Sequence, residues 1–127
     1  MLTNRFAQLI ARLAFAMAVF ATAVAALTPP ADHPLHIAPF QKGDHVIAFF
    51  ALGLLGALAA PRIPLAVLAG ALAFFGASIE VLQALPEVAR DPRATDVLID
   101  LGAAIVAIAP MGLLRRSALA RSRVAGG

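Results

Sequence analysis

Long apolar runs, separated by short polar segments, dominate the chain. Four of them are long enough for helices, at about residues 6–27, 43–60, 64–85 and 95–114. Prolines stand at most of their boundaries, where a missing N–H and a fixed φ cost least. Since every backbone amide must be paired inside lipid, such uninterrupted runs are best formed as transmembrane helices. The pattern predicts an all-α polytopic membrane protein, a bundle of four transmembrane helices over 1–114, with a basic cytoplasmic tail over 115–127.

Composition supports a membrane protein and excludes several chemistries. Of the 127 residues, 61% are apolar and 13% are charged, and the mean hydropathy is +0.90. Soluble domains carry about a quarter charged residues. Four spans nearly fill this length, so we expect no soluble catalytic domain beside them. The absence of cysteine excludes disulfides, thiolate metal sites and cysteine nucleophiles.

Basic residues divide unequally between the two sides of the predicted bundle. Seven of the ten fall on the side of the termini: Arg5, Arg12, Arg62, Arg115, Arg116, Arg121 and Arg123. Lys42, Arg90 and Arg93 fall on the other side. The positive-inside rule then predicts an inner (plasma) membrane protein with both termini in the cytoplasm. The arginines of the tail fit contact with anionic membrane lipids. Nucleic-acid binding has no support, because these arginines are few and lack accompanying aromatic residues.

Acids and histidines gather on or near the opposite, outer side. The acids are Asp32, Asp44, Glu80, Glu87, Asp91, Asp96 and Asp100, and the histidines are His33, His36 and His45. This collection indicates a polar site at the outer ends of the helices. The loop histidines also offer metal ligands, but their spacing in a proline-rich loop is a weak metal-binding pattern. We therefore predict neither a metal nor a cofactor.

The first apolar run has a second interpretation. Arg5 and Arg12 precede Ala21-Thr22-Ala23 and Ala23-Val24-Ala25, which resemble the cleavage sites of signal peptides. Cleavage would leave three spans, with the mature N-terminus outside. A retained helix explains the same residues, and four spans are kept as the prediction.

Small residues recur at steps of three and four, as close helix packing in lipid requires. The stripes are Ala11, Ala14, Ala18, Ala21 and Ala25 in the first run, Ala66, Ala69, Gly70, Ala73 and Ala77 in the third, and Ala103, Ala104 and Ala107 in the fourth. Gly53 and Gly56 supply a shorter patch in the second run. Glu80 continues the third stripe, and Asp96 and Asp100 begin the fourth. We expect polar side chains to lie on the packing faces.

Glu80 is the most informative single residue. An ionisable group more than a turn inside a membrane helix is costly and indicates function, although snorkelling or a structural ion pair also explains it. Gln83 lies on the same face at i+3. Asp96 and Asp100 repel each other unless a proton or a cation intervenes, and Asp96 also fits a capping role at the helix start.

Residues at the start of the second predicted helix complete the predicted site. His45 follows Asp44 there and fits either a proton carrier or a simple interfacial hydrogen bond. The predicted site comprises Lys42, Asp44, His45, Glu80, Gln83, Arg90, Asp96 and Asp100. Ser78 and Thr95 lie nearby without forming a triad pattern, so no catalytic residue is assigned.

Three short motifs resemble the VanZ-like membrane proteins. That family carries D-K-x-x-H opening one helix, E-x-x-Q ending the next, and R-x5-D-x3-N-x2-G leading into the last. The corresponding residues are Gln41-Lys42-Gly43-Asp44-His45, then Glu80-Val81-Leu82-Gln83, then Arg90, Asp96, Asp100 and Ala103. This chain departs from the pattern at three positions: Gln41 replaces the first acid, Asp100 the Asn and Ala103 the Gly. The resemblance covers about half the chain.

The resemblance implies a small membrane protein of unsettled biochemical activity. The family is named for a member linked to low-level resistance to the glycopeptide teicoplanin, but shared fold does not fix function. Our first hypothesis is that Lys42, His45, Gln83 and Arg90 bind an anionic or lipid-linked molecule of the cell envelope. Glu80, Asp96 and Asp100 would organise those cations or exchange protons. A second is a non-catalytic scaffold or assembly protein whose polar cluster locks the bundle. A membrane enzyme and a small proton-coupled transporter subunit, the latter requiring a homo-oligomer, are further alternatives.

Overall fold

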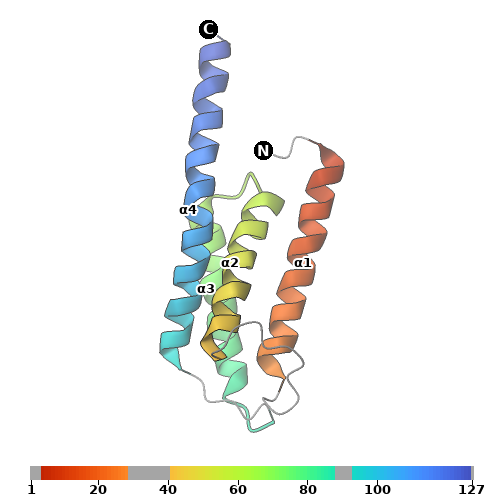
Figure 1. The fold of residues 1–127 in the computed structure, drawn as a ribbon, viewed down its shortest axis with the longest axis vertical. Helices are drawn as coiled ribbons and strands as arrows, with labels where there is room; N and C mark the ends of the chain where they lie inside the picture. Colours follow the sequence, from red (N-terminus) through yellow and green to blue (C-terminus); the bar gives the residue numbers. More distant parts are fainter. Residues whose placement is uncertain (1–3, 29–40, 88–92, 127) are drawn as a thin grey trace.

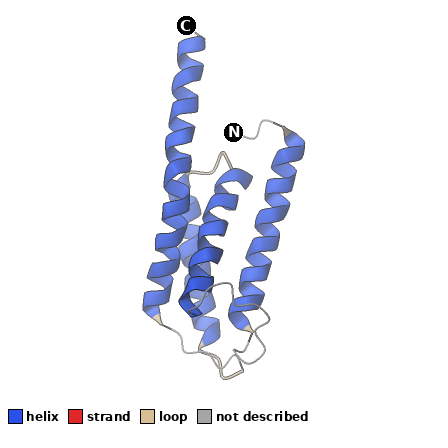
Figure 2. Cartoon of the chain, in the orientation of Figure 1, coloured by secondary structure: helices blue, strands red, loops and turns tan. Residues whose placement is uncertain are grey.

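The computed structural model describes residues 4–28, 41–87 and 93–126, and the side chains at 41–43 also lie outside the description. The described residues form helices joined by loops, without a strand (Figure 2). The four helices are α1 (Arg5–Leu27), α2 (Gln41–Ala59), α3 (Leu65–Gln83) and α4 (Ala94–Ala125). The predicted all-α class and the first three helices are confirmed within about two residues at each end.

Helix boundaries follow from local chemistry. The Asn4 side chain accepts a hydrogen bond from the Phe6 amide at 2.9 Å and so caps the start of α1. Two prolines follow Thr28 at its end. Pro64 stands at the N-cap of α3, where its missing N–H is harmless.

The helices run side by side in alternating directions, with both termini at one end (Figure 1). Helix α2 is central: it packs most extensively against α4 and α1 and also contacts α3. Phe49, Leu52 and Ala57 of α2 are fully buried. Leu52 and Ala57 pack in one cluster with Leu68 and Leu72 of α3 and with Ala104 and Ile108 of α4, whereas Phe49 packs with Ala26 and Ile79.

Glycine lets α2 approach its neighbours closely. A Cβ added at Gly53 would stand 2.7 Å from the backbone oxygen of Ala104 in α4. One added at Gly56 would stand 2.8 Å from Leu68 Cδ1 in α3 and 3.1 Å from Phe15 Cε2 in α1. The predicted small patch on the second helix is therefore a packing surface, as membrane helices require.

The small-residue stripes hold only in part. In α4 the predicted face is inside, with Asp100, Ala104 and Ala107 buried. In α3 the prediction is wrong for Ala66, Gly70 and Ala77, which are exposed, whereas Ala69 is half-buried and packs against the core. The buried residues of α3 are Leu68, Leu72, Gly76, Ile79, Glu80 and Gln83. An Ala-rich helix offers several small faces, and the larger side chains decide which one packs.

Helix α4 is longer than predicted. It continues past Arg116 to Ala125 and carries Pro110 in its interior, so the predicted end near Leu114 is wrong. Hydropathy shows where an apolar segment ends, but a helix can continue through polar residues. The residues after Leu114 favour a helix until Gly126. The predicted tail is therefore mostly a helix that projects beyond the bundle (Figure 1).

Three helices, α1, α3 and α4, are long and apolar enough to cross a membrane. The apolar part of α2, Asp44–Ala59, is shorter. Large apolar side chains lie exposed on every helix, including Phe20, Phe50, Phe74 and Leu98. Soluble monomers rarely expose so much contiguous apolar surface. These side chains therefore fit contact with lipid.

Two arginines hold the C-terminal end of α2. Arg12 Nε of α1 donates to the Ala59 oxygen at 3.3 Å. From α4, Arg115 donates to the Ile63 and Ala57 oxygens at 2.8 Å and to the Ala60 oxygen at 3.3 Å. Carbonyls at a helix end lack intrahelical partners, and cations there also face the negative end of the helix dipole.

Replacing Arg115 by alanine is expected to lower the free energy of unfolding by about 2 kcal/mol, because partly buried carbonyls lose their donors. The measurement is unfolding of the purified protein in detergent. Arg116→Ala is the matched control, since Arg116 is exposed and its side chain makes no hydrogen bond within the described residues. Its effect should stay within about 0.5 kcal/mol. Equal effects of the two changes would contradict the capping role.

Candidate functional site

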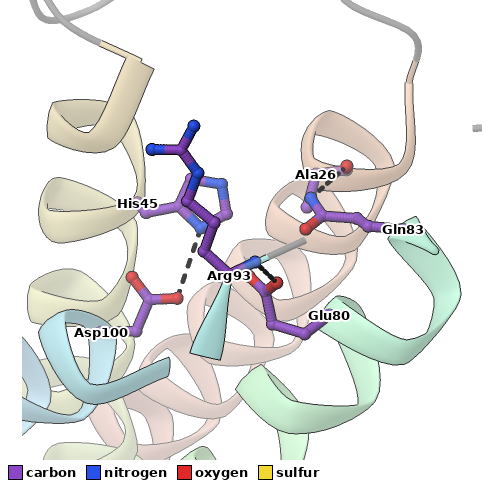
Figure 3. A network of polar contacts seen from close by, with 6 residues as sticks. All are labelled: Ala26, His45, Glu80, Gln83, Arg93 and Asp100. Carbon is purple, nitrogen blue, oxygen red and sulfur yellow. Dashed lines mark hydrogen bonds and ion pairs between the residues drawn. The ribbon is translucent and has the colours of Figure 1, made fainter. Parts of the chain in front are cut away.

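Four predicted site residues meet at the end of the bundle opposite the termini. His45 lies in the first turns of α2, Glu80 and Gln83 in the last turn of α3, and Asp100 in the second turn of α4. Alternating helix direction brings these ends together, as Figure 3 shows. Glu80, Gln83 and Asp100 are the buried polar residues of the described structure. We call His45, Glu80, Gln83, Arg93 and Asp100 the polar cluster.

His45 and Asp100 join α2 to α4. Nδ1 of His45 lies 3.3 Å from Oδ2 of Asp100, and their side chains are 16% and 4% exposed. With an ionised Asp100, a protonated Nδ1 donates this bond. The other carboxylate oxygen, Oδ1, is buried and has no hydrogen-bond partner in the described part of the chain. Such an oxygen accepts a proton or a donor readily, because an unpaired buried acceptor is costly.

Glu80 holds the beginning of α4. Its Oε2 accepts a hydrogen bond from the backbone N–H of Arg93 at 2.8 Å. Arg93 is the N-cap residue of α4 and makes no side-chain capping bond of its own. A carboxylate beside the positive end of a helix dipole is stabilised there. This contact orients the segment from which the Arg93 side chain projects.

Gln83 connects α3 to α1. Its Nε2 donates to the backbone oxygen of Ala26 at 2.8 Å, and both residues are buried. Ala26 stands in the last turn of α1, where carbonyls lack intrahelical partners. Gln83 therefore serves as a C-terminal cap for a neighbouring helix.

The remaining predicted site residues are either half-buried or outside the described residues. Asp44 is half-buried in the first turn of α2, and Asp96 is half-buried in the first turn of α4. The Lys42 side chain and Arg90 lie outside the described residues, as do the loop histidines His33 and His36. Within the described ranges, no three His, Asp or Glu side chains are placed to hold a metal ion.

Electrostatically, the cluster combines buried acceptors with an exposed cation. Arg93 is exposed, and its guanidinium points away from Glu80 toward the loop end of the bundle (Figure 3). Beneath it lie two buried carboxylates and an imidazole from three helices. This arrangement can hold an anion at the surface and exchange a proton below it.

Two features were absent from the predicted site. Arg93 is not among the predicted site residues, yet its backbone N–H is the hydrogen-bond partner of Glu80. The Ala26 carbonyl could not be predicted, because nothing in an alanine side chain indicates a bonded backbone. The sequence does indicate Arg93 in one way, because this residue immediately precedes a helix whose first two turns contain Asp96 and Asp100.

The chain was compared with models of known protein families, with curated proteins and with solved structures, and none of them matches it.

Proposed function

We propose that this chain is a VanZ-like integral membrane protein whose polar cluster binds an anionic or lipid-linked molecule of the cell envelope. The observation that carries the proposal is the meeting of His45, Glu80, Gln83 and Asp100 at one end of the bundle. These residues occupy three motifs that are far apart in the sequence. Their convergence is what a ligand site requires.

The departures from the motif fit this arrangement. Asp100, where the family has Asn, gives His45 a carboxylate partner. Ala103, where the family has Gly, packs against the buried group of Ala26, Phe49 and Ile79 beside the cluster. The substitutions therefore alter the polar contacts while leaving the cluster in place.

The proposal includes four membrane spans, with both termini in the cytoplasm and the polar cluster near the outer leaflet of the inner membrane. Helix α2 has 19 residues and runs beside the other three (Figure 1). At 1.5 Å per residue, such a helix is about 28 Å long, close to the hydrocarbon thickness of a bilayer. The described arginines Arg12, Arg62, Arg115 and Arg116 lie at the end opposite the cluster, which favours a cytoplasmic location for that end.

The ligand class follows from charge and position. An exposed guanidinium suits a phosphate, because charge-assisted hydrogen bonds to oxyanions are strong. Exposed apolar side chains such as Val81 and Leu98 lie near the same end of the bundle and suit a lipid tail. The buried carboxylates face the start of α4, whose dipole offsets part of their charge. A polyprenyl phosphate combines both features.

Replacing Arg93 by glutamine tests the proposal directly. This change removes the charge of the side chain but keeps the backbone N–H, which donates a hydrogen bond to Glu80. We expect affinity for undecaprenyl phosphate, measured by native mass spectrometry of the detergent-purified protein, to fall at least about tenfold, since a charged hydrogen bond is lost. Binding of neutral undecaprenol should not change.

The matched control is Arg121→Gln, which removes an exposed charge from the far end of α4. It should leave undecaprenyl phosphate binding within twofold of the unmodified chain. Equal binding by the Arg93 and Arg121 variants, or equal binding of undecaprenyl phosphate and undecaprenol, would contradict a phosphate site at the cluster.

A second function, a non-catalytic scaffold, is favoured by one observation. These three contacts of the cluster each join different parts of the bundle: His45 to Asp100, Gln83 to Ala26, and Glu80 to the start of α4. A cluster that only locks the helices would lose stability when these contacts are removed, and it would bind no phosphate. Arg93→Gln separates the two functions because it leaves all three contacts intact.

A further inference from the structure

A second polar feature lies at the opposite end of the bundle. A groove of about 360 Å³ opens between α1 and the turn that joins α2 to α3. Gln8, Arg12 and Phe15 line it from α1, and residues 59–63 line it from the turn. It is separate from the polar cluster, which lies at the other ends of these helices.

The groove holds hydrogen-bond donors that the protein does not use fully. Gln8 Nε2 is buried without a hydrogen-bond partner among the described residues. Arg12 commits only its Nε, to the Ala59 oxygen, leaving both terminal NH2 groups for another acceptor. Arg62 is exposed and makes no hydrogen bond or ion pair in the described ranges.

Within the described residues, no carboxylate side chain lies at this end of the bundle. The seven acids lie at positions 32, 44, 80, 87, 91, 96 and 100, and the described ones belong to the opposite half of the bundle. Gln8, Arg12 and Arg62 therefore line a groove that has no carboxylate nearby among the described residues. Unbalanced cations at the edge of a membrane attract anionic headgroups.

The remaining wall of the groove is apolar. Phe15 of α1 lies half-buried against the core, and Pro61 and Ile63 line the turn, with Ile63 largely exposed. An occupant must therefore present oxyanion oxygens to one side and hydrocarbon to the other. Free phosphate satisfies only the first requirement.

We propose that this groove binds an anionic phospholipid, with its phosphate at Gln8, Arg12 and Arg62 and an acyl chain along Phe15. The proposal rests on the membrane-spanning part of the proposed function and is independent of the polar cluster. Bound lipid would join α1 to the α2–α3 turn, beside the hydrogen bond of 3.3 Å from Arg12 Nε to the Ala59 oxygen.

The test uses the full chain in non-ionic detergent, titrated with dioleoylphosphatidylglycerol or dioleoylphosphatidylcholine and followed by native mass spectrometry. One phosphatidylglycerol should bind at least tenfold more tightly than phosphatidylcholine. Arg62→Gln and Gln8→Leu should each weaken that binding fivefold or more, and neither touches the caps of α2. Arg121→Gln, at the end of α4 beyond the bundle, should change it less than twofold.

Three results would overturn the proposal: equal affinity for the two lipids, equal affinity of the Arg62 and Arg121 variants, or displacement of the lipid by inorganic phosphate at the same concentration as by phosphatidylglycerol. The last result would identify free phosphate as the ligand. Arg93→Gln should leave phosphatidylglycerol binding intact. Its separate effect on undecaprenyl phosphate distinguishes failure at this groove from failure at the polar cluster.

Discussion

Replacing His45 by alanine is expected to lower the free energy of unfolding by about 3 kcal/mol, because removing one partner of a buried pair leaves the other uncompensated. Asp100 is 3% exposed, and its Oδ1 already lacks a described hydrogen-bond partner. Without His45 the carboxyl group must keep an unpaired charge or take up a proton, and both are costly in a low-dielectric interior. Unfolding of purified protein by denaturing detergent measures the effect.

A double-mutant cycle provides the control. Once Asp100 is alanine, the further change His45→Ala should cost less than about 1 kcal/mol, since no buried carboxylate then depends on the imidazole. Additive losses in the cycle would mean that the two side chains do not interact, and the described 3.3 Å contact would carry no energy.

Replacing Gly53 by alanine is expected to destabilise the bundle by about 2–3 kcal/mol, although alanine favours helices. The added Cβ would stand 2.7 Å from the Ala104 backbone oxygen and 3.2 Å from the Ala107 Cβ. Backbone atoms cannot move aside as a flexible side chain does. The two helices must therefore separate where they pack most extensively.

Gly70→Ala is the matched control on α3. Nothing lies within 4 Å of a Cβ built there. The same substitution should therefore stabilise the protein by about 0.5–1 kcal/mol through helix propensity alone. Melting temperatures in detergent should move in opposite directions for the two variants. A shift of the same sign would show that α2 and α4 do not cross closely at Gly53.

The helices were predictable from sequence because long apolar runs and prolines act locally. Asn4, Pro64 and the two prolines after Thr28 mark boundaries without reference to the rest of the fold. The end of α4 was not predictable from hydropathy, since the helix continues through charged residues. The packing face of α3 was not predictable either. Which face packs depends on the side chains that the buried residues of α3, such as Leu68 and Leu72, contact in the neighbouring helices.

The site was predictable as a group of residues but not as a set of contacts. Spacing along the chain puts His45, Glu80, Gln83 and Asp100 near helix ends, and alternating direction gathers those ends. Which atoms meet depends on helix rotation and on backbone groups such as the Arg93 N–H. Backbone partners have no signature in the sequence, so the contacts of Glu80 with the Arg93 N–H and of Gln83 with the Ala26 oxygen could not be predicted from it.

The location of the polar cluster near the outer leaflet of the inner membrane is the central claim, and single-cysteine accessibility tests it most directly. The chain has no native cysteine, so each introduced thiol reports alone. Glu87 lies exposed at the same end of the bundle as the polar cluster, and Ser122 lies exposed near the end of α4. Each is replaced by cysteine in a separate variant. Intact cells are treated with a membrane-impermeant thiol reagent. The account predicts labelling at position 87 and none at 122; labelling at 122 and none at 87 would contradict it.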